Sequence, residues 1–293
     1  MKISNKNISE LRNFFLSDLS DLYDENEIKS IFNILIKHFT GLSRTEILLN
    51  PNQILDNSVV QQFEKSLEDL KKNMPVQYIT EKVFFDDLEL TVKPGVLIPR
   101  PETEELIGII SKRFQDKKNE QLNILDIGCG SGCISISLKK RFPNWNVFAL
   151  DISEEALTIA KHNADKNLAE IIFVKQNILE QTKNSDLPNF DLIVSNPPYV
   201  CESEKQLMRK NVIQYEPEKA IFVKDNFPFI FYEAILNFAK NQCKDKTSVF
   251  VEINERFPVE LSMLFESNGF KNIEILKDIH EKSRFISCDF FRS

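Results

Sequence analysis

The chain has 293 residues, of which 42% are hydrophobic and 28% are charged, and its formal net charge is −7. Proteins that bind nucleic acid mainly through its phosphates are usually basic, so the acidic balance argues against direct nucleic-acid binding, although a local basic patch is still open. No stretch resembles a signal peptide or is apolar and long enough to span a bilayer, which predicts a cytoplasmic protein without membrane contact.

The first 75 residues show the hydrophobic spacing of helices. Apolar residues recur every three or four positions over residues 8–22 and again over 28–39. Ser43-Arg44-Thr45-Glu46 fits a capping box, and a further helix is expected between Asn57 and Pro75. We predict a small helical domain over residues 1–75, for which either a packing role or a partner-binding role is open.

Residues 76–99 are predicted to form a linker built around a β-hairpin. Val83–Phe85 is an apolar run and Leu88–Val92 alternates apolar and polar residues, and the two flank Asp86-Asp87. Pro94-Gly95 then ends the second strand.

From residue 100 to 293, expected strands alternate with expected helices. The strands are predicted at Asn123–Ile127, Asn146–Leu150, Ile171–Lys175, Phe190–Ser195, Ser248–Ile253, Ile273–Leu276 and Arg284–Phe290. The helices are predicted from Pro101, at 131–141 and 153–166, and near 229–240 and 258–268. Such alternation predicts an α/β domain in which helices cover both faces of a parallel sheet. The last two strands should be antiparallel, because only a few residues join them.

A glycine-rich loop follows the first strand of this sheet. Asp126-Ile127-Gly128-Cys129-Gly130-Ser131-Gly132 holds three of the seven glycines in the chain, and glycine is needed where backbone turns tightly or approaches a ligand. The spacing G-x-G-x-G differs from the G-x-G-x-x-G of dinucleotide sites. Asp126 suits a positively charged ligand, such as the ammonium and sulfonium of S-adenosylmethionine. Cofactor contacts are therefore predicted for Asp126, Gly128, Cys129, Gly130, Ser131 and Gly132.

Two further strand ends carry candidate cofactor contacts. Asp151 ends the second strand, where an acidic side chain can accept both hydroxyls of a ribose; its alternative role is to cap the next helix. Asn177 follows the third strand, where it could bind an adenine amine while Ile178 packs on the ring. The alternative is an ordinary turn asparagine.

Asn196-Pro197-Pro198-Tyr199 follows a buried-strand pattern, at the edge where open α/β sheets bind ligands. Consecutive prolines have fixed φ and no N–H group, so this turn is stiff and presents carbonyl oxygens and one side-chain amide. It suits holding a planar –NH2 group, although an ordinary loop exit is the alternative. Asn196 and Pro197 would orient the acceptor nitrogen for methyl transfer, and Tyr199 would stack on it. The reaction requires no metal.

The five cysteines predict neither a disulfide nor a metal site. No C-x-x-C pair occurs, and the three histidines are isolated from one another in the sequence. Free thiols in a reducing compartment are expected.

Several of these segments are similar to those of known proteins. The D-x-G-x-G-x-G loop, Asp151 and Asn196–Tyr199 resemble class I S-adenosylmethionine-dependent methyltransferases that modify amino groups of bases or of glutamine. More specific resemblance, to the HemK-like peptide chain release factor glutamine methyltransferases, is carried by Pro75–Ile79, Pro94–Glu104 and Tyr215–Pro217.

The resemblance implies transfer of a methyl group from S-adenosylmethionine to N5 of the glutamine in the Gly-Gly-Gln motif of class 1 peptide chain release factors. It implies a Rossmann-like, mixed seven-stranded sheet over residues 100–293, preceded by a helical substrate-docking domain and a hairpin linker. Gly128–Gly132, Asp151 and Asn196 would contact the cofactor, and Asn196, Pro197, Pro198 and Tyr199 would hold the glutamine. Arg100 and Glu102 are expected near the substrate; the alternative is an ordinary helix start with an exposed ion pair.

The sequence departs from the family pattern at three places. Glu81 stands where the family usually has glycine, and residues 223–228 and 278–284 differ from the usual motifs. These departures concern surface loops and contacts at the edge of the substrate.

Two alternative functions are open at the level of sequence. The first is methylation of an exocyclic base amine in DNA or RNA, because that acceptor is also a planar –NH2 group. The second is a cofactor-binding module without activity, which the intact Asn196–Tyr199 segment argues against.

Overall fold

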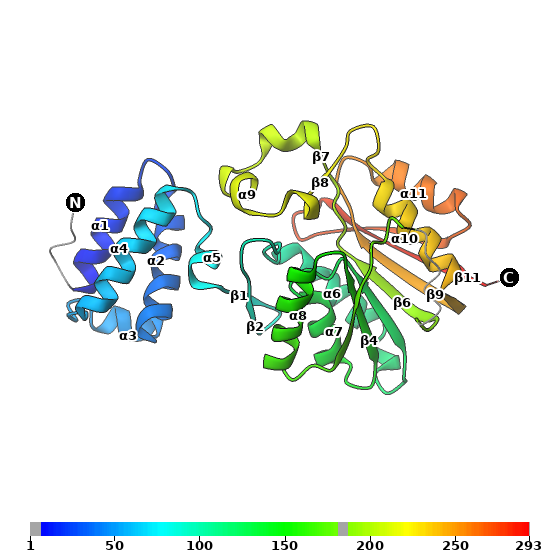
Figure 1. The fold of residues 1–293 in the computed structure, drawn as a ribbon, viewed down its shortest axis with the longest axis horizontal. Coiled ribbons are helices and arrows are strands. Elements are labelled where there is room, and N and C mark those ends of the chain that lie inside the picture. Colours follow the sequence, from blue (N-terminus) through cyan, green and yellow to red (C-terminus); the bar gives the residue numbers. More distant parts are fainter. Residues whose placement is uncertain (1–6, 181–186, 293) are drawn as a thin grey trace. The chain divides into compact units, whose positions relative to one another are not determined.

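The computed structural model describes residues 7–180 and 187–292, which form two compact units (Figure 1). The helical unit contains the chain up to Glu81 together with Arg209–Tyr215. The sheet unit contains Lys82–Met208 and the chain from Glu216 onward. The chain therefore passes from the sheet unit into the helical unit and back between residues 208 and 216.

The helical unit is built around a core of phenylalanine rings. Its helices are α1 (Ile8–Leu19), α2 (Glu25–Thr40), α3 (Arg44–Leu49), α4 (Asn57–Lys71), α5 (Val76–Thr80) and α9 (Lys210–Tyr215). Phe15, Phe32 and Phe63 are fully buried, and their ring centroids lie 5.4–5.7 Å apart. Helix α3 begins with the expected capping box, in which Ser43 and Glu46 satisfy each other's backbone N–H groups.

Two left-handed backbone positions explain features of the linker. Glu81 ends α5 with φ +54°, a conformation that favours glycine, which is the residue usual in the family at this place. Asp86 and Asp87 both have positive φ and join β1 (Lys82–Phe85) to β2 (Leu88–Thr91), as in a type I′ turn. The predicted hairpin is therefore present.

The sheet unit contains the predicted mixed sheet. Among the described residues it has seven strands in the order β10-β11-β9-β6-β3-β4-β5. Their bounds are β3 Asn123–Ile127, β4 Asn146–Asp151, β5 Ile171–Lys175, β6 Phe190–Ser195, β9 Cys243–Glu252, β10 Lys271–Lys277 and β11 Ser283–Phe291. Five neighbouring strands of the sheet, β5, β4, β3, β6 and β9, are parallel to one another. Strand β11 is antiparallel to both of its neighbours, β9 and β10.

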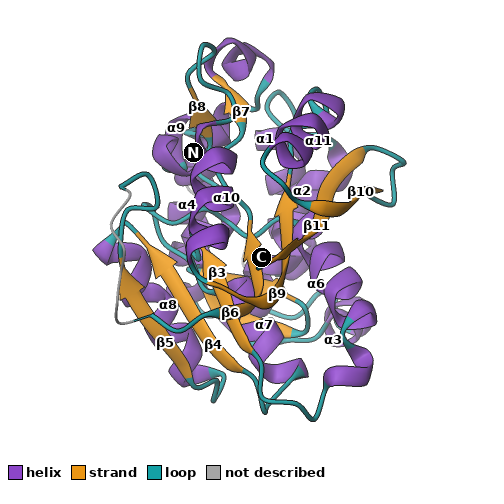
Figure 2. Cartoon of the chain, turned by 90° about the vertical axis from the view of Figure 1, so that its right-hand side faces the viewer, coloured by secondary structure: helices purple, strands orange, loops and turns teal. Residues whose placement is uncertain are grey.

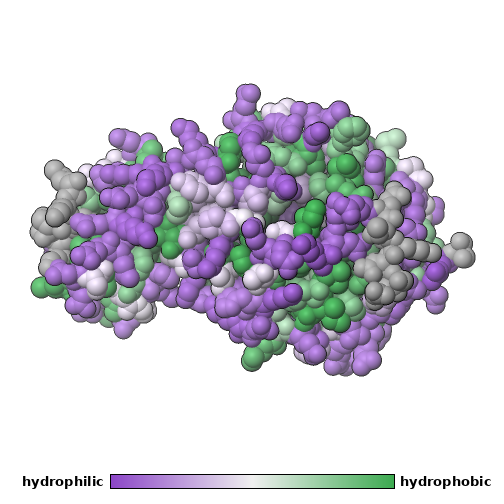
Figure 3. Space-filling model, in the orientation of Figure 1, coloured by the Kyte–Doolittle hydropathy of each residue, from purple (hydrophilic) through white to green (hydrophobic). Residues whose placement is uncertain are grey.

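Helices cover both faces of this sheet (Figure 2). One face packs on α6 (Pro101–Arg113), α7 (Cys133–Arg141) and α8 (Glu154–Lys166). The other packs on α10 (Ile230–Asn241) and α11 (Pro258–Ser267). The face drawn in Figure 3 is mostly hydrophilic, with hydrophobic patches over the sheet unit. Within residues 7–180 and 187–292, no helix has the length and apolar character needed to cross a membrane.

The segment between β6 and α10 contains short elements that the sequence patterns do not predict. They are β7 (Val200–Cys201), the 3-10 helix η2 (Glu202–Leu207), α9, the 3-10 helix η3 (Glu218–Ala220) and β8 (Phe222–Val223). Strands of two residues and helices of three to six residues are too short to show a hydrophobic period. A further 3-10 turn, η1 (Gln115–Lys117), follows α6.

Gly132 is confined by both its conformation and its surroundings. It precedes α7 with φ +80°, and a Cβ atom there would lie 3.2 Å from Ala160 Cβ and 3.2 Å from Ile136 Cδ1. The missing side chain therefore lets α7 and α8 approach each other at the glycine loop.

Gly132→Ala should lower the free energy of unfolding by about 1–3 kcal/mol, through backbone strain and the contact with Ala160. Gly108→Ala is the matched control, because Gly108 is exposed within α6 and its Cβ would meet nothing within 4 Å. That control should gain about 0.5–1 kcal/mol from its helix propensity. Urea unfolding of both variants measures the two free energies of unfolding. Equal changes in both would contradict the conclusion that the surroundings of Gly132 exclude a side chain.

Candidate active site

The glycine loop and the Asn-Pro-Pro-Tyr turn begin side by side. Strands β3 and β6 are parallel neighbours in which Ile127 pairs with Ser195. The hydroxyl of Ser195 donates to the carbonyl oxygen of Ile127 at 2.7 Å. Gly128 directly follows β3 and Asn196 directly follows β6, so both loops begin at the same edge of the sheet, where the parallel strands end.

The glycine loop is held by the end of β4. The N–H groups of Gly128 and Cys129 both donate to the carbonyl oxygen of Leu150, at 2.7 and 3.0 Å. The N–H of Gly130 donates to Asp151 Oδ2 at 2.9 Å. Gly128 and Gly130 have positive φ, and a Cβ at either would point into open space. This backbone is therefore accessible to a ligand.

Asp126 lies beneath this loop and is fully buried. Its Oδ2 accepts hydrogen bonds from the N–H of Ser135, at 3.1 Å, and from the Ser135 hydroxyl. Its Oδ1 and the hydroxyl oxygen of Ser131 are buried without a hydrogen-bond partner among the described residues. Burial raises the pKa of Asp126 to about 7; the nearby Asp151 adds to this rise and the Ser135 hydrogen bonds oppose it.

The structure shows different environments for the other two predicted cofactor contacts. Asp151 is half-buried, and its two oxygens accept from the N–H groups of Gly130 and Ser153, each at 2.9 Å. Each oxygen retains a further lone pair for a ligand. Asn177 instead forms bonds within its own turn, to the N–H of Leu179 and to the Glu180 carboxylate. Its contact with an adenine stays a prediction, as does that of Ile178.

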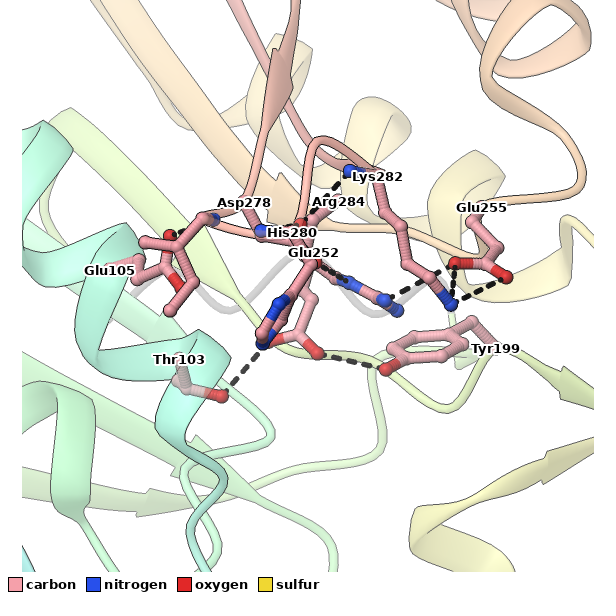
Figure 4. Close-up of polar contacts among 10 residues, drawn as sticks. Thr103, Glu105, Tyr199, Glu252, Glu255, Asp278, His280, Lys282 and Arg284 are labelled. Atoms are coloured by element: carbon pink, nitrogen blue, oxygen red, sulfur yellow. Dashed lines mark hydrogen bonds and ion pairs between the residues drawn. The ribbon is translucent and has the colours of Figure 1, made fainter.

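A chain of hydrogen bonds supports the Asn-Pro-Pro-Tyr turn. Asn196 Nδ2 donates to Thr103 Oγ1 at 3.2 Å, and the Thr103 hydroxyl donates to Glu252 Oε2 at 2.9 Å. The Tyr199 hydroxyl donates to Glu252 Oε1 at 2.8 Å (Figure 4). The turn's own polar groups are thus fixed by residues from α6 and β9. Pro197 is buried and Pro198 half-buried.

Thr103 and Glu252 are site residues that the sequence reasoning missed. Thr103 lies inside the segment Pro94–Glu104, in which the resemblance indicates only Arg100 and Glu102. Glu252 lies within the predicted strand Ser248–Ile253, where a carboxylate interrupts an otherwise apolar run. Charged residues are rarely buried without a partner, so a glutamate at the end of a buried strand could have indicated a site residue.

Arg100 and Glu102 occupy different positions at the start of α6. Arg100 Nη2 lies 2.6 Å from Glu216 Oε1, and Glu216 Oε2 accepts from the N–H of Ile98 at 3.2 Å. The carboxylate of Glu216 is buried, so this ion pair is not the exposed one considered as the alternative. Glu102 is half-exposed and lies close enough to Glu252 to raise the pKa of that carboxyl group. A substrate contact from either residue stays a prediction.

Comparisons with known proteins assign both units to described families. The family model "Methyltransferase small domain" matches residues 108–218, and "PrmC N-terminal domain" matches residues 10–80. A release factor glutamine methyltransferase of Flavobacterium psychrophilum is 42% identical over 97% of this chain and 99% of its own length. One of Bacteroides thetaiotaomicron is 36% identical over 94% of this chain and 98% of its own length.

A solved structure supports the fold. The crystal structure of a methyltransferase from Pyrococcus furiosus matches 78% of this chain and 98% of its own, with a TM-score of 0.51 and 18% identity. At this identity the likeness shows the fold alone.

Asp126→Asn should remove a pH dependence of stability. The folded-state pKa of about 7 lies above the unfolded value of about 3.9, so the folded protein holds this proton more tightly. The resulting stability is complete below about pH 4 and is lost as the pH rises through 7. Relative to the variant, the wild type should lose up to about 4 kcal/mol over this range.

Urea unfolding at several pH values, without ligand, measures this difference. Asp116→Asn is the control, because Asp116 is an exposed carboxylate in the turn after α6. Parallel pH curves for the wild type and Asp126→Asn would contradict the burial argument.

Proposed function

The chain belongs to the release factor glutamine methyltransferases, and we propose that its sheet-edge site methylates N5 of the glutamine in the Gly-Gly-Gln motif of class 1 release factors. The methyl donor is S-adenosylmethionine. The observation that carries this proposal is the pairing of β3 with β6, which starts the glycine loop and the Asn196–Tyr199 turn at adjacent positions.

The glycine loop fits the methyl donor. S-adenosylmethionine, when bound, supplies an electrophilic methyl group on a positively charged sulfur. Gly128 and Gly130 leave open space over their backbone, and Asp126 Oδ1 and Ser131 Oγ are buried polar atoms in need of a partner. Asp151 retains lone pairs for the ribose hydroxyls. These residues would hold the cofactor.

The Asn196 side chain has one polar atom left for the substrate. Because its Nδ2 donates to Thr103, its Oδ1 can accept a hydrogen bond from the –NH2 of glutamine. The carbonyl oxygen of Pro197 would accept the second N–H. The lone pair of an amide nitrogen is delocalised, so these two bonds raise its electron density as well as orient it. The nitrogen loses its proton after the methyl group is transferred, so no strong base is required.

The helical unit is the proposed docking site for the release factor. It carries the match to the "PrmC N-terminal domain" model. The Tyr215 hydroxyl donates to the carbonyl oxygen of Lys72 at 2.9 Å, and Arg209 lies 3.1 Å from Glu27. These bonds place residues 209–215 in the same compact unit. Glu216, which binds Arg100, follows directly in the sequence. Docking that shifts residues 209–215 would therefore also shift the partner of Arg100.

Asn196→Ala should lower the rate of methyl transfer to a release factor at least about 100-fold, because an acceptor that polarises the amide is lost. The variant should remain folded, and Asn144→Ala, an exposed asparagine before β4, should keep wild-type turnover. Transfer is followed with labelled S-adenosylmethionine. Unchanged turnover in Asn196→Ala would remove this residue from the mechanism.

The same assay separates the alternatives by its substrates. A release factor, a release factor with Asn in place of the motif glutamine, and nucleic acid are offered in turn. Label on the first alone is expected. Label on nucleic acid but not on the release factor would establish base methylation instead, and cofactor binding without any transfer would indicate an inactive module.

Deletion of residues 1–72 should raise the KM for the release factor about tenfold or more, equivalent to at least about 1.4 kcal/mol of binding. Cofactor affinity should stay nearly unchanged, because the residues proposed to hold the cofactor all lie in the sheet unit. Calorimetric titration with S-adenosylmethionine measures this second quantity. Equal losses of both would contradict a separate docking role.

A further inference from the structure

A buried carboxylate that the proposed chemistry does not use links Asn196 to Tyr199. We propose that Glu252 is a positioning residue, which sets the direction of the hydrogen bonds running through Thr103 to Asn196 and directly to Tyr199. It thereby keeps the Asn196 side-chain oxygen, rather than its –NH2, turned toward the substrate amide. This inference rests on the proposed function and explains how the substrate-holding turn is kept in the productive arrangement.

The geometry brings three separate elements onto one carboxylate. Glu252 ends β9 and is 1% exposed. Thr103, which is equally buried, reaches Oε2 from the first turn of α6, and Tyr199 reaches Oε1 from the turn after β6 (Figure 4). The hydroxyl of Tyr232 donates to the backbone carbonyl of Glu252 at 3.0 Å, so the end of the strand is itself held.

The direction of each bond follows from the number of protons available. An ionised carboxylate can only accept, whereas the Thr103 and Tyr199 hydroxyls have one proton each. When Glu252 is ionised, both hydroxyls must therefore donate to it, which is the direction that the contact geometry has for each bond. Thr103 is then left as an acceptor toward Asn196, and only the Nδ2 of Asn196 can satisfy it.

The asparagine amide does not determine its own orientation. Its oxygen and its –NH2 are nearly equal in size, so packing alone discriminates poorly between the two flipped states. If Thr103 could donate to Asn196, the amide could turn its –NH2 toward the –NH2 of the substrate. Two donors would then face each other, and the hydrogen bond that polarises the substrate nitrogen would be lost.

A cation beside Glu252 favours its charged form. Burial raises the pKa of Glu252, and Glu102 adds to this rise, while the hydrogen bonds from Tyr199 and Thr103 and the charge of nearby Arg284 oppose it. Burial and Glu252 likewise raise the pKa of Tyr199, and Arg284 opposes this rise. Arg284 is held in turn by Asp278, whose Oδ2 accepts from Arg284 Nε at 3.2 Å.

The hairpin loop between β10 and β11 supports this arginine. Asp278 Oδ1 accepts from the N–H groups of His280 and Lys282, at 2.9 and 3.0 Å, and the N–H of Ile279 donates to Glu105 of α6 at 3.0 Å. Residues 278–284 depart from the usual family motif, yet they still place a guanidinium next to the Glu252 carboxylate.

A purely structural role would have a different signature. Removing a charge from water is costly, and burial raises the pKa of Glu252, so a neutral glutamine of similar shape avoids that desolvation cost. A role in packing alone therefore predicts that a glutamine at 252 preserves activity together with stability. Positioning predicts instead that stability is kept while turnover falls. The –NH2 of a glutamine at 252 must donate to the hydroxyl of Thr103 or of Tyr199, and this reverses the direction of that hydrogen bond.

The test compares Glu252→Gln, Thr103→Val and Thr103→Ser in the full-length protein. Thermal unfolding, calorimetric binding of S-adenosylmethionine, and kcat and KM for release-factor methylation are measured for each. Glu260→Gln is the control for the carboxylate, since Glu260 is an exposed acid in the first turn of α11, away from Arg284 in the sequence and on another element. Thr247→Val is the control for a buried hydroxyl, since Thr247 donates to the Phe190 carbonyl at the opposite edge of the sheet.

We expect Glu252→Gln and Thr103→Val to lower kcat at least about tenfold, while the cofactor affinity and, for Glu252→Gln, the melting temperature stay near wild type. Thr103→Ser should recover most of the turnover, because it restores the hydroxyl, and both controls should keep wild-type kcat.

Wild-type kcat in Glu252→Gln would overturn the inference. So would equal losses in Thr103→Ser and Thr103→Val, or a loss in Thr247→Val as large as that in Thr103→Val, because either result would indicate packing rather than direction. If the wild-type protein binds the cofactor but methylates no release factor, the proposed function fails and takes this inference with it. That outcome is distinguishable, because it appears before any variant is compared.

Discussion

The parallel pairing of β3 with β6 is the constraint on which the rest of the site depends. From β3 the chain runs outward to β4 and β5 and then returns to add β6 on the other side of β3. In open α/β sheets ligands bind where the strand order reverses in this way. The pairing of Ile127 with Ser195 brings the glycine loop and Asn196 to one edge, although 67 positions separate Asn196 from Cys129 in the sequence. A slip of one residue would turn every β6 side chain to the opposite face.

A second constraint is that the polar groups behind this edge lie in a dry interior. There each donor and acceptor needs a partner, so the identity of one group dictates the orientation of the next. The start of α6 distributes such bonds: Arg100 binds Glu216, and Thr103 binds both Glu252 and Asn196. The start of α6 therefore helps to determine how the Asn196–Tyr199 turn is arranged.

Much of the fold could be predicted because its signals are local. The hairpin follows from the strand patterns on either side of Asp86-Asp87, and the sheet follows from buried strands that alternate with helical periods. The expected start of β9 at Ser248 was wrong, since the strand begins at Cys243. Lys244, Asp245 and Lys246 conceal it, because these polar residues near the start of the strand are partly or fully exposed and lack the apolar pattern of its buried part. The short elements between β6 and α10 were not predicted, because they contain too few residues to show a hydrophobic period.

The sequence by itself determined which groups stand at each strand end: the glycines that permit left-handed turns, the acid after β4, and the stiff turn at Asn196. These follow from backbone restrictions acting within a few residues. Only the tertiary structure decided that Asp126 is buried beneath its loop and that Glu252 joins Thr103 to Tyr199. Such partnerships depend on strand order and on how α6 packs against β9. Folding brings Thr103 to Glu252 across 149 positions and Tyr199 to Glu252 across 53, which is beyond the reach of any local pattern.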